Sequence, residues 1–147
     1  MINTFKATAT KLPEGLAVET ACRDFKFVLD EPAELGGTNK GMNPVEALLC
    51  ALGACQSIVV AAFAQAKGFT YESFHIELEG DLDPDGFTGM NPAVRKGFQE
   101  IRVNFVFKTD EPREKVEDFV KFVEETCPVG DCLGNGVPIK RSGIVIE

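Results

Sequence analysis

Tryptophan is absent from the sequence, and tyrosine and histidine each occur once. The single histidine, His75, shares one face of a predicted strand with Glu77 and Glu79, which is typical of a solvated strand face. No second histidine is present to build a Ser-His-Asp or Cys-His arrangement. Basic residues number 15 against 23 acidic ones, for a net charge of −8, and no basic patch with interleaved aromatic residues occurs. This charge balance argues against nucleic acid or an anionic membrane as a partner.

Nucleotide-binding signals are also missing. The glycines at 36, 37 and 41 are not followed by a Gly-Lys-Ser/Thr sequence, and no GxGxxG opens a helix after a strand, so we expect no cofactor. The first ten residues, MINTFKATAT, lack a basic segment followed by an apolar one. We therefore expect no secretory signal, a cytoplasmic protein, and five cysteines kept as reduced thiols.

The longest uncharged stretch, residues 47–66, predicts a central helix. Its apolar residues fall on every side, which indicates burial all round. Asn43 is suited to cap its N-terminus, Pro44 to its first position, and Gly68 to stop it. The stretch is long enough to span a membrane. Its Ala, Gly, Ser and Gln content and the absence of interfacial Trp or Tyr favour a core helix instead.

The other elements predict one domain over residues 1–147, with an α+β fold and a mostly antiparallel sheet. Twelve phenylalanines predict a core built on aromatic packing. A second helix is expected to begin with Asp110 as N-cap and to end at Cys127, because Pro128 disfavours its continuation. Its apolar stripe is Val116, Phe119, Val120, Val123 and Cys127. Strands are expected at 2–10, 16–21, 25–29, 73–81, 99–108 and 144–146, with long loops at 30–44 and 83–98.

Two pairings of the cysteines deserve comparison. Cys50 with Cys55, and Cys127 with Cys132, have the look of a four-cysteine zinc site. Five residues along a helix place Cys50 and Cys55 about 140° apart, however, and structural zinc sites take closer spacings, so we expect no metal. Alternatively, Cys55 and Cys127 meet where the two apolar helix faces pack. They are then either small core side chains or a functional thiol pair, for which Cys132 is a competing second thiol.

The residues that carry a resemblance are GGTNKGMNPVEALLCALGAC at 36–55 and Cys127-Pro128-Val129 near the end of the later helix. Together they resemble the two cysteine motifs of the OsmC/Ohr family, which comprises osmotically inducible protein C, organic hydroperoxide resistance proteins and their relatives. The segment GDLDPDGFTGMNPAVRKGF at 80–98 is similar to the loop of an OsmC-like branch outside the best-known peroxidases. The resemblance covers nearly the whole chain in order.

The resemblance implies an intertwined homodimer in which the sheets wrap around paired central helices. It implies that Cys55 attacks an organic hydroperoxide and becomes a sulfenic acid, and that Cys127 resolves it as a disulfide. A dithiol, dihydrolipoyl groups in some members, would then restore the thiols. The implied role is defence against oxidative stress.

This chain departs from the family at the groups that activate the cysteine. The usual glutamate position is Val45, and Glu46, one residue later, is a possible orienting carboxylate. The usual arginine turn reads Leu12-Pro13-Glu14-Gly15, so the cation would have to come from elsewhere. Candidates are Lys11, Arg23, Arg95 and Arg113. Two alternatives remain open: a protein without catalysis that binds a small apolar ligand, and a thiol redox sensor or carrier without peroxidase turnover.

Overall fold

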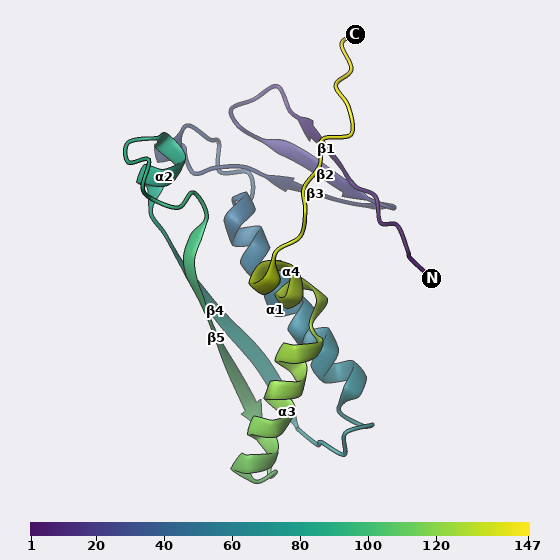
Figure 1. Cartoon of the computed structure of the whole chain (residues 1–147). Coiled ribbons are helices and arrows are strands. Elements are labelled where there is room, and N and C mark those ends of the chain that lie inside the picture. Colours follow the sequence, from purple (N-terminus) through teal and green to yellow (C-terminus); the bar gives the residue numbers. More distant parts are fainter. The chain divides into compact units, whose positions relative to one another are not determined.

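The structure is a computed structural model that describes the whole chain, Met1–Glu147. It contains two compact units, residues 1–49 and 50–147, and the boundary between them falls inside the long helix α1. Figure 1 shows the elements along the chain. In order they are β1 (Thr8–Lys11), β2 (Val18–Cys22), β3 (Phe25–Leu29), a 3-10 turn η1 (Ala33–Leu35), α1 (Pro44–Phe63), β4 (Ser73–Leu82), α2 (Pro84–Thr88), β5 (Phe98–Lys108), α3 (Arg113–Thr126) and α4 (Pro128–Asn135).

The first unit is built on a three-stranded antiparallel sheet in the order β1-β2-β3. Strands β2 and β3 pair from Val18 opposite Leu29 to Cys22 opposite Phe25, so a two-residue turn joins them. Arg23 in that turn has a φ of 54°, as tight hairpin turns require. The predicted strand at 25–29 is confirmed. The strand predicted at 2–10 is shorter, because pairing with β2 covers only Thr8–Lys11.

A buried carboxylate organises the loop that leads from β3 to α1. Asp30 is 2% exposed, and it accepts hydrogen bonds from the Thr38 hydroxyl at 2.6 Å and from the backbone N–H groups of Glu31 at 2.8 Å and Lys40 at 3.1 Å. These bonds, that of Thr38 above all, outweigh burial and lower the pKa of Asp30 to about 2. The loop lacks periodicity in sequence, but it is tied to one side chain.

Helix α1 begins where the sequence predicts. The Asn43 side chain accepts a hydrogen bond from the N–H of Glu46 at 2.9 Å, and the Glu46 carboxylate accepts one from the N–H of Asn43 at 3.2 Å. This reciprocal pair is a capping box. The helix ends at Phe63, earlier than expected, and the chain reverses through Gly68, which has a φ of 63°.

The expected burial of α1 on all sides does not hold within a single chain. Its buried residues lie along one face: Leu52, Gly53, Gln56, Val59 and Val60. On the opposite face Ile58 is 68% exposed. By length and composition α1 is the one helix that could cross a membrane, and 28% of its most apolar window is buried. One chain supplies packing partners for only one side of this helix.

The second unit combines part of α1 with an antiparallel hairpin, β4–β5, and the helices α3 and α4. Along β4 half-buried and exposed residues alternate over ten positions, as the sequence predicts. The half-buried side includes Phe74, Ile76 and Leu78. The predicted loop at 83–98 contains a short helix, α2, which the sequence analysis missed. Asp83 caps it by accepting a hydrogen bond from the N–H of Asp85 at 3.0 Å.

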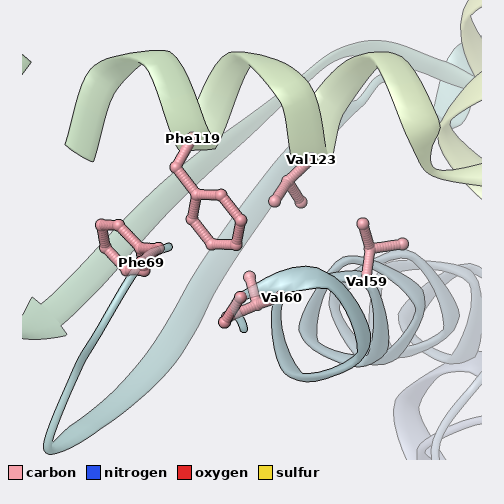
Figure 2. Packing of buried hydrophobic residues seen from close by; sticks show 6 residues of the cluster. Val59, Val60, Phe69, Phe119 and Val123 are labelled. Atoms are coloured by element: carbon pink, nitrogen blue, oxygen red, sulfur yellow. The ribbon is translucent and has the colours of Figure 1, made fainter. Parts of the chain in front are cut away.

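The hydrophobic core of this unit lies between α1, α3 and the hairpin. Figure 2 shows Val59 and Val60 of α1 directed towards Phe119 and Val123 of α3. The ring of Phe69 stacks on that of Phe119 with centroids 4.3 Å apart. Partly buried aromatic side chains from the strands pack against the cluster, among them Tyr71, Phe74, Phe105 and Phe107. The prediction of an aromatic core is confirmed, and so is the α+β class.

In the last third of the chain one helix end is confirmed and two expectations need correction. Helix α3 ends at Thr126 with Cys127 as its C-cap, as predicted, and Pro128 then starts a further helix, α4, that was not expected. Pro112, and not Asp110, is the N-cap residue of α3. The strand expected at 144–146 is unpaired, and Ile144, Val145 and Ile146 are exposed. A strand needs an open sheet edge beside it, and this tail forms no ladder within the chain.

Candidate functional site: a pair of cysteine thiols

Cys55 lies on α1 at the border between its packed face and its open face. Leu52 and Val59, one turn before and after it, are buried, whereas Ala54 and Ile58 are exposed. Cys55 itself is partly exposed. The thiol therefore has the hydrophobic core on one side and an open apolar helix face on the other.

Cys127 lies at the junction of two helices. Its N–H donates to the Val123 carbonyl at 3.0 Å and ends α3, while its carbonyl accepts from the N–H of Asp131 at 2.9 Å in α4. Pro128 after it favours an extended backbone at Cys127, which has φ −67° and ψ 115°. This geometry turns the side chain into the N-cap of α4, where its Sγ accepts a hydrogen bond from the Gly130 N–H at 3.3 Å.

The structure brings the two thiols together. Burial raises the pKa of Cys127, and the hydrogen bond from the Gly130 N–H lowers it. A side-chain hydrogen bond with Cys55 and the negative charge of Cys55 raise the pKa of Cys127 further. Cys127 is 1% exposed. It therefore keeps its proton at neutral pH and shares it with the Cys55 sulfur, because two thiolates in contact would repel each other. In this arrangement Cys55 is the more accessible of the two sulfurs.

The remaining cysteines are exposed and lie elsewhere. Cys22 ends β2, Cys50 is near the start of α1, and Cys132 is in α4; no disulfide links any of the five. Cys132 is the fifth residue of α4, and a helical span of that length separates Cα atoms by more than a disulfide usually bridges. The structure thus places Cys127 beside Cys55. The role of Cys132 as a competing second thiol stays a prediction from the sequence.

Glu46 is engaged in the capping box of α1 and is exposed. Two of the candidate cations also have partners: Arg113 pairs with Glu117 at 2.9 Å, and the Arg23 guanidinium lies 4.8 Å from the centre of the Phe25 ring. The structure thus shows a capping role for Glu46, and its role as an orienting carboxylate stays a prediction.

His75 is exposed, and its Nε2 lies 3.0 Å from a Glu77 carboxylate oxygen. A surface depression of about 320 Å³ beside it is lined by residues 77–79 and 102–104 and contains neither cysteine of the pair. On the same surface Arg102 contacts three carboxylates, those of Glu79, Asp81 and Glu100. This polar face of the hairpin is the solvated strand face that the sequence predicts.

Two groups near the thiols are not predicted from the sequence. Gly130 supplies the N–H at Cys127, and the spacing Cys-Pro-x-Gly could have indicated it, since proline in the first turn and a third-position N–H define an N-cap. Gln56, next to Cys55, is 5% exposed, and its Oε1 has no hydrogen-bond partner. An uncharged helix pattern does not distinguish a buried amide from a solvated one.

The chain thus has an α+β fold in which two helices hold adjacent cysteine thiols. The chain is a member of the OsmC family: the family profile, described as OsmC-like protein, matches residues 37–142. A hydroperoxide reductase from Mycoplasma genitalium is 26% identical over 126 residues, which are 83% of this chain and 82% of that protein.

Solved structures show the same fold. An OsmC-like protein from Mycoplasma pneumoniae has a TM-score of 0.79 at 24% identity, covering 91% of this chain and 89% of that one. An organic hydroperoxide resistance protein OsmC from Legionella pneumophila has a TM-score of 0.69 at 23% identity, covering 95% and 96%. The fold expected from the two cysteine motifs is confirmed.

Proposed function

We propose that this protein reduces organic hydroperoxides through a thiol cycle at Cys55 and Cys127. The observation that carries the proposal is the contact between these two thiols, one buried and protonated and the other partly open. The name hydroperoxide reductase, which the Mycoplasma genitalium relative bears, supports the same activity. Only the family and its fold come from the comparisons; the assignment of the two roles rests on the geometry of this chain.

The proposed cycle has two oxidative steps. Cys55 attacks the terminal oxygen of the hydroperoxide, the O–O bond breaks, an alcohol leaves, and Cys55 becomes a sulfenic acid. Cys127 then attacks the Cys55 sulfur, water leaves, and a disulfide forms. A dithiol reductant restores both thiols. The buried position of Cys127 next to Cys55 keeps the sulfenic acid short-lived, which limits its further oxidation.

The test counts thiols after one equivalent of cumene hydroperoxide is added to the reduced protein. Wild type should lose two thiols, Cys55→Ser none, and Cys127→Ser one, with its sulfenic acid trapped by dimedone. Cys22→Ser is the matched control, because it removes an exposed cysteine in the first unit, and it should lose two. No thiol loss in wild type would refute the proposal. Two thiols lost without turnover on a dithiol would indicate a redox sensor, and binding without oxidation a ligand-binding protein.

We also propose that the working form is a homodimer. The open face of α1 is apolar and consists of small residues around one large one: Ala51, Ala54, Ile58, Ala61 and Ala62. Exposed apolar surface of this kind is typical of an interaction site, and it adjoins Cys55. A second copy that covers this face would surround the thiol pair with apolar side chains. Such surroundings suit the binding of a small apolar hydroperoxide.

The dimer is tested with a buried charge. Ile58→Glu places a carboxylate in the centre of the open face, whereas Gln99→Glu adds the same charge at an exposed position of β5. Analytical ultracentrifugation should find a dimer for wild type and Gln99→Glu, and a monomer or unfolded chain for Ile58→Glu. A monomeric wild type would refute the dimer. Partition of the wild type into detergent without a soluble dimer would point instead to α1 as a membrane segment.

A further inference from the structure

Gln56 is a polar residue in the middle of the buried face of α1. Its side chain is 5% exposed, and its Oε1 has no hydrogen-bond partner within the chain. At about 100° per residue, its side chain leaves the helix between those of Leu52 and Val60, which are both buried. Nearly all buried polar atoms in folded proteins are hydrogen-bonded, so a buried acceptor without a donor needs an explanation. The packing of α1 against α3 places a donor beside it.

The register of the two helices brings this donor, the thiol of Cys127, to Gln56. The helices run in opposite directions (Figure 1), and Val123 of α3 packs against the valines at 59–60 of α1 (Figure 2). Cys127 lies one turn further along α3. It therefore packs against the residues one turn before the two valines, which are Cys55 and Gln56. The contact between Cys127 and Cys55 agrees with this register.

The thiol hydrogen of Cys127 therefore has two acceptors beside it. One is the Cys55 sulfur, to which it is hydrogen-bonded in the reduced chain. The other is the Oε1 of Gln56, a neutral amide oxygen. Because a charged acceptor binds a hydrogen more strongly than a neutral one, the hydrogen stays on the Cys55 side while Cys55 is a thiolate. This preference ends when the Cys55 sulfur is bonded to oxygen or to another sulfur, because it is then uncharged.

We infer that Gln56 is a positioning residue, which takes the Cys127 S–H once Cys55 is no longer a thiolate and so turns the Cys127 sulfur towards Cys55. The inference rests on the proposed function, because it concerns the second oxidative step of that cycle. With its hydrogen directed at Gln56, Cys127 presents a sulfur lone pair to the Cys55 sulfur. The S–S bond forms, the S–O bond of the sulfenic acid breaks, and its electron pair goes to the hydroxyl, which leaves as water with the Cys127 proton.

Leucine at position 56 separates this role from a structural one. Gln56→Leu removes the acceptor and keeps the volume of the side chain, so we expect a folded chain in which the Cys127 S–H has lost its second partner. An amide with only a structural role has no effect on that S–H or on the attack by Cys127. Gln65→Leu is the matched control, since Gln65 lies beyond the end of α1 and is exposed.

The first measurement locates the S–H by infrared spectroscopy. The chain used lacks the other four cysteines, with alanine in place of Cys55 and serine in place of the rest, so that Cys127 carries the only thiol and its first acceptor is gone. In this background Gln56→Leu should move the S–H stretching band to higher wavenumber, because the S–H loses a hydrogen bond, whereas Gln65→Leu should leave it in place. An unmoved band in Gln56→Leu would overturn the inference.

The second measurement times the attack by Cys127 without peroxide. A chain that keeps only Cys55 and Cys127 receives one equivalent of dithiodipyridine, a small aromatic disulfide. Cys55 forms a mixed disulfide and releases the first thiopyridone; Cys127 then attacks the Cys55 sulfur and releases the second. This second phase should be about two- to tenfold slower in Gln56→Leu than in the parent chain or in Gln65→Leu, because one hydrogen bond is lost. Equal second phases would overturn the inference, even with a shifted infrared band.

Neither measurement depends on the reaction with peroxide, so the two proposals fail separately. If hydroperoxide removes no thiol from the wild type while both measurements give the expected result, the proposed function fails, and the role of Gln56 in forming the disulfide stands. If hydroperoxide oxidises both thiols but either measurement fails, the proposed function stands and Gln56 is a structural amide.

Discussion

Replacing Gln56 by leucine should stabilise the protein. Gln56 lies on the buried face of α1 and is 5% exposed, and its Oε1 has no hydrogen-bond partner. A buried acceptor without a hydrogen bond costs about 1–3 kcal/mol, whereas leucine has a similar volume and is an equally good helix former. We therefore expect Gln56→Leu to raise the free energy of unfolding by about 1–3 kcal/mol. At roughly 2–4 °C per kcal/mol for a chain of this size, Tm should rise by several degrees.

The assay is thermal and urea unfolding, followed by circular dichroism at a fixed protein concentration. Gln65→Leu is the matched control: Gln65 is exposed beyond the end of α1, so its replacement should change stability by about 0.5 kcal/mol or less. A loss of more than about 1 kcal/mol in Gln56→Leu would refute the reasoning. It would show that the amide makes a hydrogen bond in solution, to a buried water or to a second copy. A thiol count on the stabilised variant then shows whether the amide also acts on Cys55.

Three further predictions concern other parts of the chain. The pKa of Asp30 is about 2 against an ordinary 3.8, so its stabilising effect is complete above about pH 4 and is lost as pH falls towards 2; Asp30→Asn should lower Tm at pH 7, and this difference should shrink towards pH 2. Phe119→Ala removes a ring from the core and should cost about 3–5 kcal/mol in urea unfolding, against about 0.5 kcal/mol or less for the exposed Phe87→Ala. Gly130→Pro removes the N–H at Cys127, whereas Gly130→Ala keeps it and adds a Cβ at 3.5 Å from Cys127, an ordinary contact. Because the Gly130 N–H stabilises negative charge on the Cys127 sulfur, reduction of the disulfide by dithiothreitol should be up to about tenfold slower in the proline variant than in the alanine variant. The rate is measured by the release of free thiols, and equal rates would show that the Gly130 N–H has no part in the reduction.

Local signals in the sequence predicted the elements that local interactions form. Asn43 and Pro44 marked the start of α1 because a cap and a fixed φ act within one turn. The alternation of β4 and the stripe of α3 were visible because each element buries one side. The stripe also brought Cys127 to the core, and together with the position of Cys55 on α1 it predicted that the two helices hold adjacent thiols.

Features that depend on distant partners could not be predicted in this way. The sequence of α1 does not show whether other parts of the protein cover both of its faces. In the structure, the rest of the chain covers only one face. The strand expected at 144–146 has a suitable composition but needs a sheet edge that the chain does not offer it. The spacing of Glu46 from Asn43 is that of a capping box, which the structure shows, whereas its role as an orienting carboxylate stays a prediction.

The position of Cys127 between two helices has a consequence for local stability. In the reduced chain its sulfur accepts the Gly130 N–H and so closes the first turn of α4. When that sulfur is bonded to Cys55 it is a poorer acceptor, and the first turn loses part of its cap. Oxidation should therefore let α4 open more often, and amide hydrogen exchange at Gly130 and Asp131 should be faster in the disulfide form. The redox state of the cysteine pair would then change the rate at which α4 opens locally, without any change in the rest of the fold.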